Sequence, residues 1–321
     1  MELSAHLLLI VGAVGLDALL GDPVYRLHPI RILGAWTLRC EHWLFGAGLD
    51  GRFGGSLLWL LSVGGALLGG WALHLALALV HPWLAFGWDI FIAYSLLCTR
   101  DLLGQGRRVL TNLDDLPTAR RELQMLVSRE TSALPGAGVV RATIESLSEN
   151  LTDGVLTPLW ALCLFGLPGL ILVKAVSNLD SMVGYKSERY AQFGWAGARS
   201  DDLVHWLPAR LSVAVIALAA AITRLHPRSV LPTARKYHAM LPSPNSGWSE
   251  AACAGALQVR LVGPIWHEGR LVNEAYMGDP EWPAELNANH LRRALDLILT
   301  ASLIAFALGL VLAPLRLSMP W

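Results

Sequence analysis

The chain has 321 residues, of which 54% are apolar and only 16% are charged, whereas an ordinary soluble domain has about 25% charged residues. Acidic and basic residues balance at 25 each, so no net positive charge favours nucleic acid as a partner. The four cysteines are scattered and form no CxxC pair, which argues against a disulfide framework or a zinc site. This composition excludes a disordered chain and disfavours a simple soluble protein.

In chain order, six apolar stretches are candidates to cross a bilayer, which takes about 20 residues of helix. They cover residues 3–20, 55–80, 84–99, 155–176, 206–222 and 295–315. The polar segments between them cover residues 21–54, 100–154, 177–205 and 224–294. A large buried helical core is the alternative, but the stretch at 55–80 contains no Asp, Glu, Lys or Arg. We therefore predict an all-α polytopic membrane protein with about four to six membrane segments and polar helical loops, forming one integral-membrane domain over residues 1–321.

The fifth stretch is interrupted by Gly166, Pro168 and Gly169. Each half is then too short to cross a bilayer alone, and we predict that the stretch can form a re-entrant hairpin. Arginine clusters at residues 100–141 and 224–293 both favour the cytoplasmic side. If the fifth and sixth stretches both span, residues 177–205 face the opposite side, and if neither spans, every polar segment faces the cytoplasm; the sequence leaves both arrangements open.

An acidic column marks the segment 141–154, which we predict to be a helix that ends near Gly154. Glu145, Glu149 and Asp153 recur every four residues, so on a helix they are surface neighbours whose like charges repel. Such a column calls for a cation, and carboxylate oxygens suit Mg²⁺, which commonly takes one or two carboxylates together with substrate phosphate oxygens. A solvated acidic face is the alternative, and the pattern alone favours neither.

A second polar segment follows the fifth apolar stretch. Lys174 and Asp180 lie at its apolar edge, where charges are costly and usually paired or functional. Lys186 and Arg189 could hold a phosphate or a carboxylate, although a positively charged membrane margin would explain them equally well. Two further polar patches lie at residues 199–202 and 241–248, the latter with the composition of a turn.

Taken together, the motifs of this chain resemble those of the CobD/CbiB-type cobalamin-biosynthesis family, the adenosylcobinamide-phosphate synthases. The motifs that carry the resemblance are Leu16-Asp-Ala-Leu-Leu-Gly-Asp-Pro, His28-Pro29, Glu145-Ser146, Glu149-Asn150, Asp153-Gly154 with Pro158, Leu179-Asp-Ser-Met-Val-Gly-Tyr-Lys, Glu188-Arg-Tyr, Phe193-Gly-Trp, Asp201-Asp202, Leu207-Pro-Ala-Arg, Pro242-Ser-Pro-Asn-Ser-Gly-Trp, Glu250-Ala-Ala and Ala254-Gly-Ala-Leu. They extend over nearly the whole chain. Ser177-Asn178 departs from the Asn-Thr pair that the family pattern has before Leu179.

The resemblance implies a multi-pass enzyme of the cell inner membrane whose active site faces the cytoplasm. It would join a propionate carboxyl of the corrinoid adenosylcobyric acid to (R)-1-amino-2-propanol or its O-phosphate, giving adenosylcobinamide or its phosphate. A carboxylate does not condense with an amine in water without activation, so we expect ATP with Mg²⁺ to activate it through an acyl phosphate or an adenylate. Expected partners are these substrates, the lipid bilayer and other late corrin-pathway membrane enzymes, and not nucleic acid.

Roles for individual residues follow as hypotheses. The expected Mg²⁺ ligands are Glu145, Glu149, Asp153 and Asp180. The expected catalytic residues are Arg129, Lys186 and Arg189, which would bind phosphate and stabilise negative charge, and Asp201 or Asp202, which would accept a proton from the amine. The expected substrate-binding residues are His28, Asn178, Ser181, Arg199 and Asn245.

Two alternatives from other functional classes remain. A transporter or corrinoid-binding membrane protein could use the charges at Asp17, Lys174 and Asp180 along a solute path, but the sequence has no inverted repeat. A scaffold for other enzymes of the corrin pathway would need neither the acidic column nor the pair Lys186 and Arg189. Product formation that depends on ATP and Mg²⁺ separates the enzyme from both.

Overall fold

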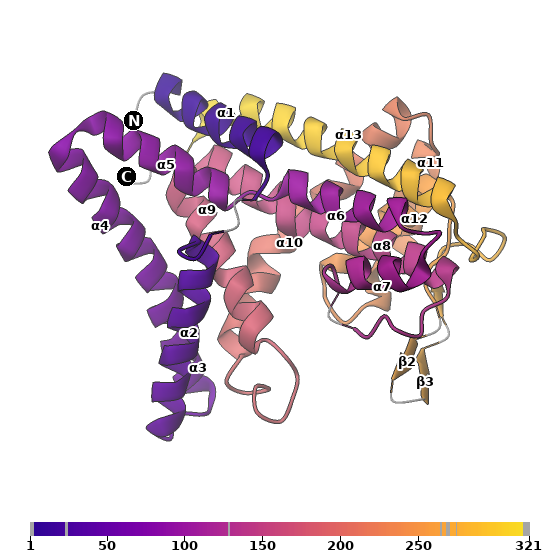
Figure 1. Cartoon of the computed structure of the whole chain (residues 1–321), viewed down its shortest axis with the longest axis horizontal. Coiled ribbons are helices and arrows are strands. Elements are labelled where there is room, and N and C mark those ends of the chain that lie inside the picture. Colours follow the sequence, from indigo (N-terminus) through magenta and orange to yellow (C-terminus); the bar gives the residue numbers. More distant parts are fainter. Residues whose placement is uncertain are drawn as a thin grey trace. The chain divides into compact units, whose positions relative to one another are not determined.

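The computed structural model describes residues 3–22, 25–127, 129–263, 265–267, 270–273 and 275–316 (Figure 1). In these ranges the chain is almost entirely helical. The α-helices are α1 (Leu3–Leu20), α2 (Pro29–Gly46), α3 (Arg52–Trp59), α4 (Gly65–Val80), α5 (Pro82–Ser95), α6 (Thr99–Thr111), α7 (Leu116–Gln124), α8 (Gly136–Asn150), α9 (Thr157–Val183), α10 (Trp195–Ile222), α11 (Pro227–Tyr237), α12 (Ser246–Leu257) and α13 (Ala288–Leu312).

Short elements of other types connect these helices. The π-helical turns are η1 (Leu60–Gly64) and η2 (Leu151–Leu156), and the 3₁₀ turns are η3 (His238–Met240) and η4 (Ala313–Leu315). The strands are β1 (Leu261–Val262), β2 (Ile265–His267), β3 (Arg270–Asn273) and β4 (Tyr276–Met277). β1 pairs with β4 and β2 pairs with β3, both antiparallel.

In the described part of the chain, six helical stretches are long and apolar enough to cross a membrane, and each contains one of the apolar stretches of the sequence. They are Leu3–Leu20, Arg52–Val80, Pro82–Thr111, Gly136–Val183, Trp195–Ile222 and Ala288–Leu315. Only 6% of the most apolar window of Arg52–Val80 is buried inside the protein. A helix that is apolar on all sides and unburied by protein is stable in lipid. The chain is therefore a polytopic helical membrane protein, as the sequence predicts.

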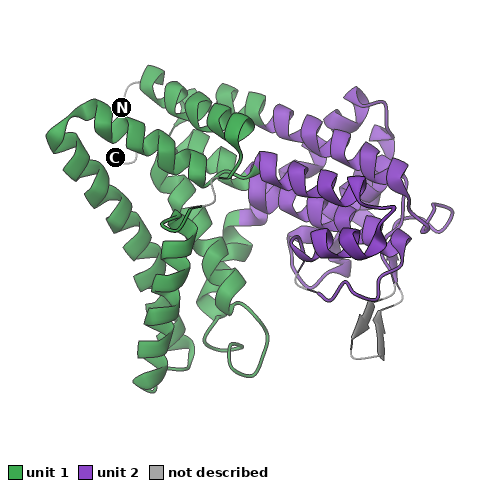
Figure 2. Ribbon diagram, viewed as in Figure 1, with its two compact units in different colours: residues 1–98, 157–204, 306–321 green, residues 99–156, 205–305 purple. Residues whose placement is uncertain are grey.

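The chain divides into two compact units (Figure 2). Unit 1 comprises residues 1–98, 157–204 and 306–321, and unit 2 comprises residues 99–156 and 205–305. The polar segments of the sequence are shared between them, so each unit has a set of polar side chains of its own. The single integral-membrane domain expected from the sequence stays a prediction.

Within unit 1, α9 bends sharply at Gly166, where φ is 69° and ψ is −160°. Glycine reaches this region without the steric cost that a side chain would incur. A Cβ atom placed on Gly169 would lie only 2.8 Å from the carbonyl oxygen of Ala161, although a straight helix would separate these two residues by about 12 Å. The two halves of α9 therefore meet at a sharp bend at Gly166, and the hairpin predicted from Gly166, Pro168 and Gly169 stays a prediction. Its re-entrant placement in a bilayer stays a prediction.

Within unit 2, α8 carries the acidic column, and its apolar side is buried, with Ile144, Leu147 and Leu151 each 0% exposed. The predicted helix end near Gly154 is wrong. Gly154 does not take the positive φ that commonly ends a helix. The chain instead runs through the π-helical turn η2 and directly into α9. Buried apolar residues continue on both sides of Gly154, so packing favours continuation of the helix over termination.

Candidate functional site

The most polar cavity among those described lies in unit 2 and has a volume of about 450 Å³. Its walls come from the segment after α7, from α8, from the residues before and within α12, and from β1. The residues that line it are Leu126, Val127, Arg129, Ala142, Glu145, Ser146, Glu149, Leu241, Pro242, Ser243, Ser246, Glu250 and Val262. Three glutamates and one arginine therefore face a space large enough for part of a small-molecule substrate.

Each carboxylate oxygen of Glu145 accepts a hydrogen bond from another part of unit 2. The Nη2 of Arg129 donates to its Oε2 at 2.6 Å, and the backbone N–H of Val262 donates to its Oε1 at 2.8 Å. The Glu145 side chain is 11% exposed and that of Arg129 is 37% exposed. A buried carboxylate needs such partners to offset its lost hydration. The pair thus fixes the guanidinium of Arg129 at the cavity wall.

Glu250 is the second buried carboxyl of the cavity, on α12, and is 5% exposed. Burial raises the pKa of its carboxyl well above the ordinary value, and the negative charges of Glu149 and Glu145 raise it further. The positive charge of Arg129 opposes this rise. Two carboxyls of one cavity thus differ in environment, because Glu145 has a cation and a backbone N–H as partners and Glu250 is surrounded by like charge.

Glu149 and Asp153 continue the acidic column toward solvent, Glu149 as an exposed residue and Asp153 as a half-buried one. The Nδ1 of His205, which is 1% exposed, lies 3.3 Å from Oδ1 of Asp153. Among the described residues, no three His, Cys, Asp or Glu side chains lie close enough together to hold a metal ion by themselves. The metal-ligand roles of Glu145, Glu149, Asp153 and, in unit 1, Asp180 stay predictions.

In unit 1, Arg189 contacts Glu41 and Phe45. Its Nη2 donates to Oε1 of Glu41 at 2.9 Å, and the hydroxyl of Tyr190 donates to the same oxygen at 2.9 Å. Its guanidinium also lies over the ring of Phe45, 4.3 Å from the ring centroid. Glu41 is buried at 5% exposure, so Arg189 stabilises a buried carboxylate in addition to any contact with substrate.

Asp201 and Asp202 lie at the start of α10, also in unit 1. The hydroxyl of Ser177 donates to Oδ1 of Asp201 at 2.9 Å. Arg199 lies 3.5 Å from Asp202, and the charge of Lys186 also acts on Asp202. Ser177 is the position at which the chain departs from the family pattern, so this departure directly contacts a predicted catalytic carboxylate.

The predicted substrate-binding residues have local partners. His28 caps α2 by accepting from the backbone N–H of Ile30 at 3.3 Å, and its Nε2 lies 2.9 Å from Oδ1 of Asp22. Asn178 donates to the Sδ of Met182 at 3.3 Å.

Ser181 and Asn245 differ in exposure. Ser181 is exposed at the end of α9, whereas Asn245 is buried and accepts from Arg210 at 3.1 Å. The neighbours of Asn245, Ser243 and Ser246, line the unit 2 cavity. The binding roles of these residues and of Arg199 stay predictions.

Sequence reasoning placed Glu250 in a family motif but gave it no role, and it missed His205 and Glu41. Glu250 had a signal, because it is the only charged residue in α12, a helix of mostly small residues, SGWSEAACAGAL. A lone carboxyl in such a helix is either exposed or functional. His205 and Glu41 lie in ordinary helical sequence, and only the fold shows that they pair with Asp153 and Arg189.

The donor set of the unit 2 cavity fits both an anion and a hard cation. Arg129 has a buried Nε with no hydrogen-bond partner among the described residues, and such orphaned donors are uncommon unless a ligand or water satisfies them. The Glu149 carboxylate faces the same space and is of the type that Mg²⁺ prefers.

Comparison of the sequence with known proteins identifies the family to which the chain belongs. The family model described as "CobD/Cbib protein" matches residues 10–298. The chain is 40% identical over 281 residues to "Cobalamin biosynthesis protein CobD" of Geobacter metallireducens, covering 87% of this chain and 88% of the relative. It is 36% identical over 313 residues to the protein of the same name from Photorhabdus laumondii, covering 95% and 96%.

A third relative, "Cobalamin biosynthesis protein CbiB" of Salmonella typhimurium, is 35% identical over 300 residues, covering 91% of this chain and 93% of the relative. No solved structure matches the chain. The match extends through both units, including the acidic column of α8 and the polar segment after α9. The chain belongs to the CobD/CbiB family and has a role in cobalamin biosynthesis.

Proposed function

We propose that this protein forms an amide between a propionate carboxyl of adenosylcobyric acid and (R)-1-amino-2-propanol or its O-phosphate, and that the reaction takes place at the polar cavity of unit 2. The observation that carries the proposal is the combination of Arg129, Glu145, Glu149 and Glu250 on the walls of that one cavity. In the reaction a C–N bond forms, the activated C–O bond of the carboxyl breaks, and the attacking ammonium loses its protons.

Glu250 is the residue best suited to accept a proton from the amine. Its carboxyl is buried on the cavity wall, and burial raises its pKa well above the ordinary value. An acid–base group works best when its pKa lies near the working pH. This assignment moves the proton acceptor from Asp201 or Asp202, which belong to unit 1, to a carboxyl that shares a cavity with Arg129.

Arg129 would hold the negative charge of the activated carboxyl or of its phosphate. The ion pair with Glu145 fixes the direction of the guanidinium before substrate arrives, so little reorganisation is needed when charge develops. Glu145 therefore acts as a positioning residue in this proposal. Both of its oxygens already accept hydrogen bonds, which makes Glu149 the better placed carboxylate for a cation.

ATP with Mg²⁺ would supply the activation, by making one carboxyl oxygen of adenosylcobyric acid a good leaving group. Glu149 would hold the cation and Arg129 the phosphate, since these are the wall groups whose chemistry fits each. Lys186, Arg189, Asp201 and Asp202 belong to unit 1, where we propose that they bind other polar parts of the substrates.

We further propose that the protein lies in the inner membrane with the unit 2 cavity on the cytoplasmic side. Both arginine-rich segments of the sequence, residues 100–141 and 224–293, fall inside unit 2. The excess of arginine and lysine in short loops favours the cytoplasmic side. This is also the side on which ATP is available.

The test is to incubate the detergent-purified protein with adenosylcobyric acid, MgATP and each of the two amines, and to measure product mass. We expect a new species whose mass is that of the two substrates less one water, formed only with MgATP. Comparison of the two amines identifies the acceptor. A folded protein that binds the corrinoid but forms no amide with either amine would instead support the transporter or scaffold alternatives.

A further inference from the structure

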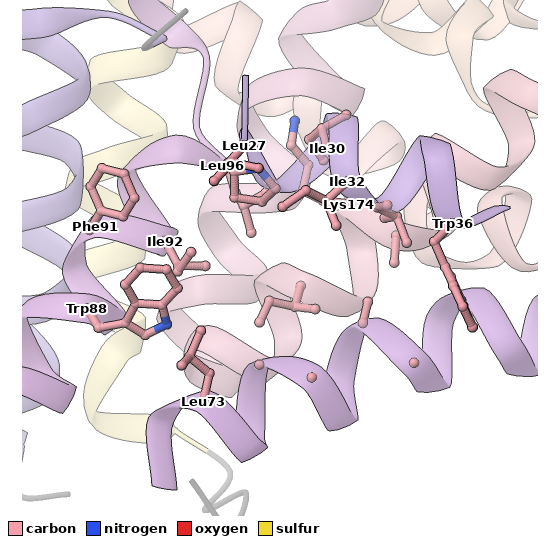
Figure 3. Close-up of a pocket in the computed structure, with 18 of the residues that line it drawn as sticks. Leu27, Ile30, Ile32, Trp36, Leu73, Trp88, Phe91, Ile92, Leu96 and Lys174 are labelled. Carbon is pink, nitrogen blue, oxygen red and sulfur yellow. The ribbon is translucent and has the colours of Figure 1, made fainter. Parts of the chain in front are cut away.

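Unit 1 contains a second cavity, of about 590 Å³, lined by α2, α4, α5, α9 and the segment before α2 (Figure 3). Its walls are almost wholly apolar and include Leu33, Trp36, Leu73, Trp88 and Phe91. No residue of this cavity has a role in the reaction proposed above. Its size lies within the range of small-molecule sites, and its lining excludes a polar metabolite.

Among the residues that the structure describes, Lys174 is the one charged residue that lines this cavity. In Figure 3 it lies on the same side as Leu27, Ile30 and Ile32, whereas Trp88 and Leu73 lie on the other side. Among the described residues, no carboxylate lies within ion-pair distance of the Lys174 ammonium. An unpaired charge at the edge of an apolar membrane segment costs free energy. An anion from outside the described chain would therefore stabilise this ammonium.

The wall formed by α4 is open to such a molecule. Gly65, Gly69 and Gly70 line the cavity there. A Cβ atom on Gly69 would meet nothing within 4 Å. α4 belongs to the stretch Arg52–Val80, of whose most apolar window only 6% is buried inside the protein, so the surface of this helix is accessible to bilayer lipid.

We propose that this cavity binds an acidic phospholipid, with an acyl chain between the apolar walls and the headgroup phosphate on Lys174. The apolar walls select a hydrocarbon chain over a free phosphate, because a small anion gains nothing from Leu73, Trp88 and Phe91. The ammonium selects an anionic headgroup over a zwitterionic one, whose own cation competes for the phosphate. The adjacent bilayer supplies the lipid, and no bond is made or broken.

The experiment places the full-length protein in phosphatidylcholine nanodiscs that contain a minority of phosphatidylglycerol, and then counts lipids retained on the protein by native mass spectrometry after gentle delipidation. We expect retained phosphatidylglycerol to be enriched about tenfold over its share of the nanodisc, which corresponds to about 1.4 kcal/mol. Lys174→Gln should abolish the enrichment while retaining lipid, and Lys174→Arg should preserve it.

A second variant tests the cavity itself. Gly69→Phe directs a ring into the open space and should lower the amount of either lipid retained. Gly15→Phe is the matched control, because its Cβ also meets nothing within 4 Å and Gly15 does not line the cavity. Equal retention of both lipids by the unaltered protein, unchanged enrichment in Lys174→Gln, or equal losses in the two glycine variants would each overturn the proposal. Retention of inorganic phosphate in place of lipid would overturn it as well.

Discussion

The two cavities are similar in size, about 450 Å³ in unit 2 and 590 Å³ in unit 1, but their linings are opposite. The unit 2 cavity holds several charges that act on one another, and its central carboxylate is bonded by groups from distant parts of the sequence, Arg129 and Val262. The unit 1 cavity has apolar walls and, in the described part of the chain, the single charge of Lys174. Chemistry that moves protons and stabilises charge requires the first kind of lining, whereas the second kind suits the binding of an apolar chain that carries one negative charge.

Of the changes considered, replacing Arg129 should have the largest effect on the charged lining of the unit 2 cavity. Arg129→Met leaves the buried Glu145 without its cation, so we expect a loss of about 3 kcal/mol of stability, at the low end for buried pairs, because the Arg129 side chain is 37% exposed. Amide formation should fall by at least about a hundredfold. Thermal unfolding in detergent and product mass measure the two effects.

The double variant Arg129→Met with Glu145→Gln provides the control for that loss. It removes the stranded charge, so stability should recover while activity stays low. Recovery of both would mean that Arg129 has only a structural role.

Neutralising Glu250 should change pH dependence as well as rate. The pKa of this carboxyl is raised in the folded protein, so its protonated form favours the folded state. The corresponding stability is fully present below the unfolded-state pKa of about 4.3 and is lost as pH rises through the folded pKa. Glu250→Gln imitates the protonated form, so its unfolding temperature should depend less on pH than that of the unaltered protein.

The same variant should lower kcat by about a hundredfold or more, the usual range for loss of a general base. It should also remove the rise in rate that accompanies ionisation of Glu250 as pH increases. If the variant and the unaltered protein have parallel pH profiles of both rate and unfolding temperature, Glu250 has no titrating role.

The smallest expected effect concerns the polar group of unit 1. Tyr190→Phe removes one of two donors to the buried Glu41 and leaves Arg189 in place. We expect a loss of about 1 kcal/mol of stability with kcat unchanged, measured by thermal unfolding and by product formation. A large fall in kcat without loss of stability would show that this group belongs to the reacting centre.

Much of the fold could be predicted because it depends on local pattern. The six apolar stretches and the break at Gly166 follow from runs of apolar residues and from glycine and proline positions. The helix end near Gly154 was wrong because the packing of Leu151 and Leu156, which is tertiary, overrides the local preference of glycine.

The candidate site was predictable in part. The spacing of Glu145, Glu149 and Asp153 identified α8 as a polar helix, but spacing does not reveal which carboxylate is buried or paired. The partners that decide this, Val262 and Glu250, lie far along the chain. The proposed proton acceptor depends on burial, and burial is a property of the folded protein.

The most direct test of the central claim, that the amide forms at the unit 2 cavity, compares MgATP-dependent product formation by Glu149→Gln and Glu130→Gln. Glu149 lines the cavity, whereas Glu130 is exposed and does not line it, so both variants lose one carboxylate of the same segment of unit 2. We predict that Glu149→Gln requires at least about tenfold more Mg²⁺ for half-maximal rate and that Glu130→Gln behaves as the unaltered protein. Equal Mg²⁺ requirements in all three proteins would contradict the assignment of the active site to this cavity.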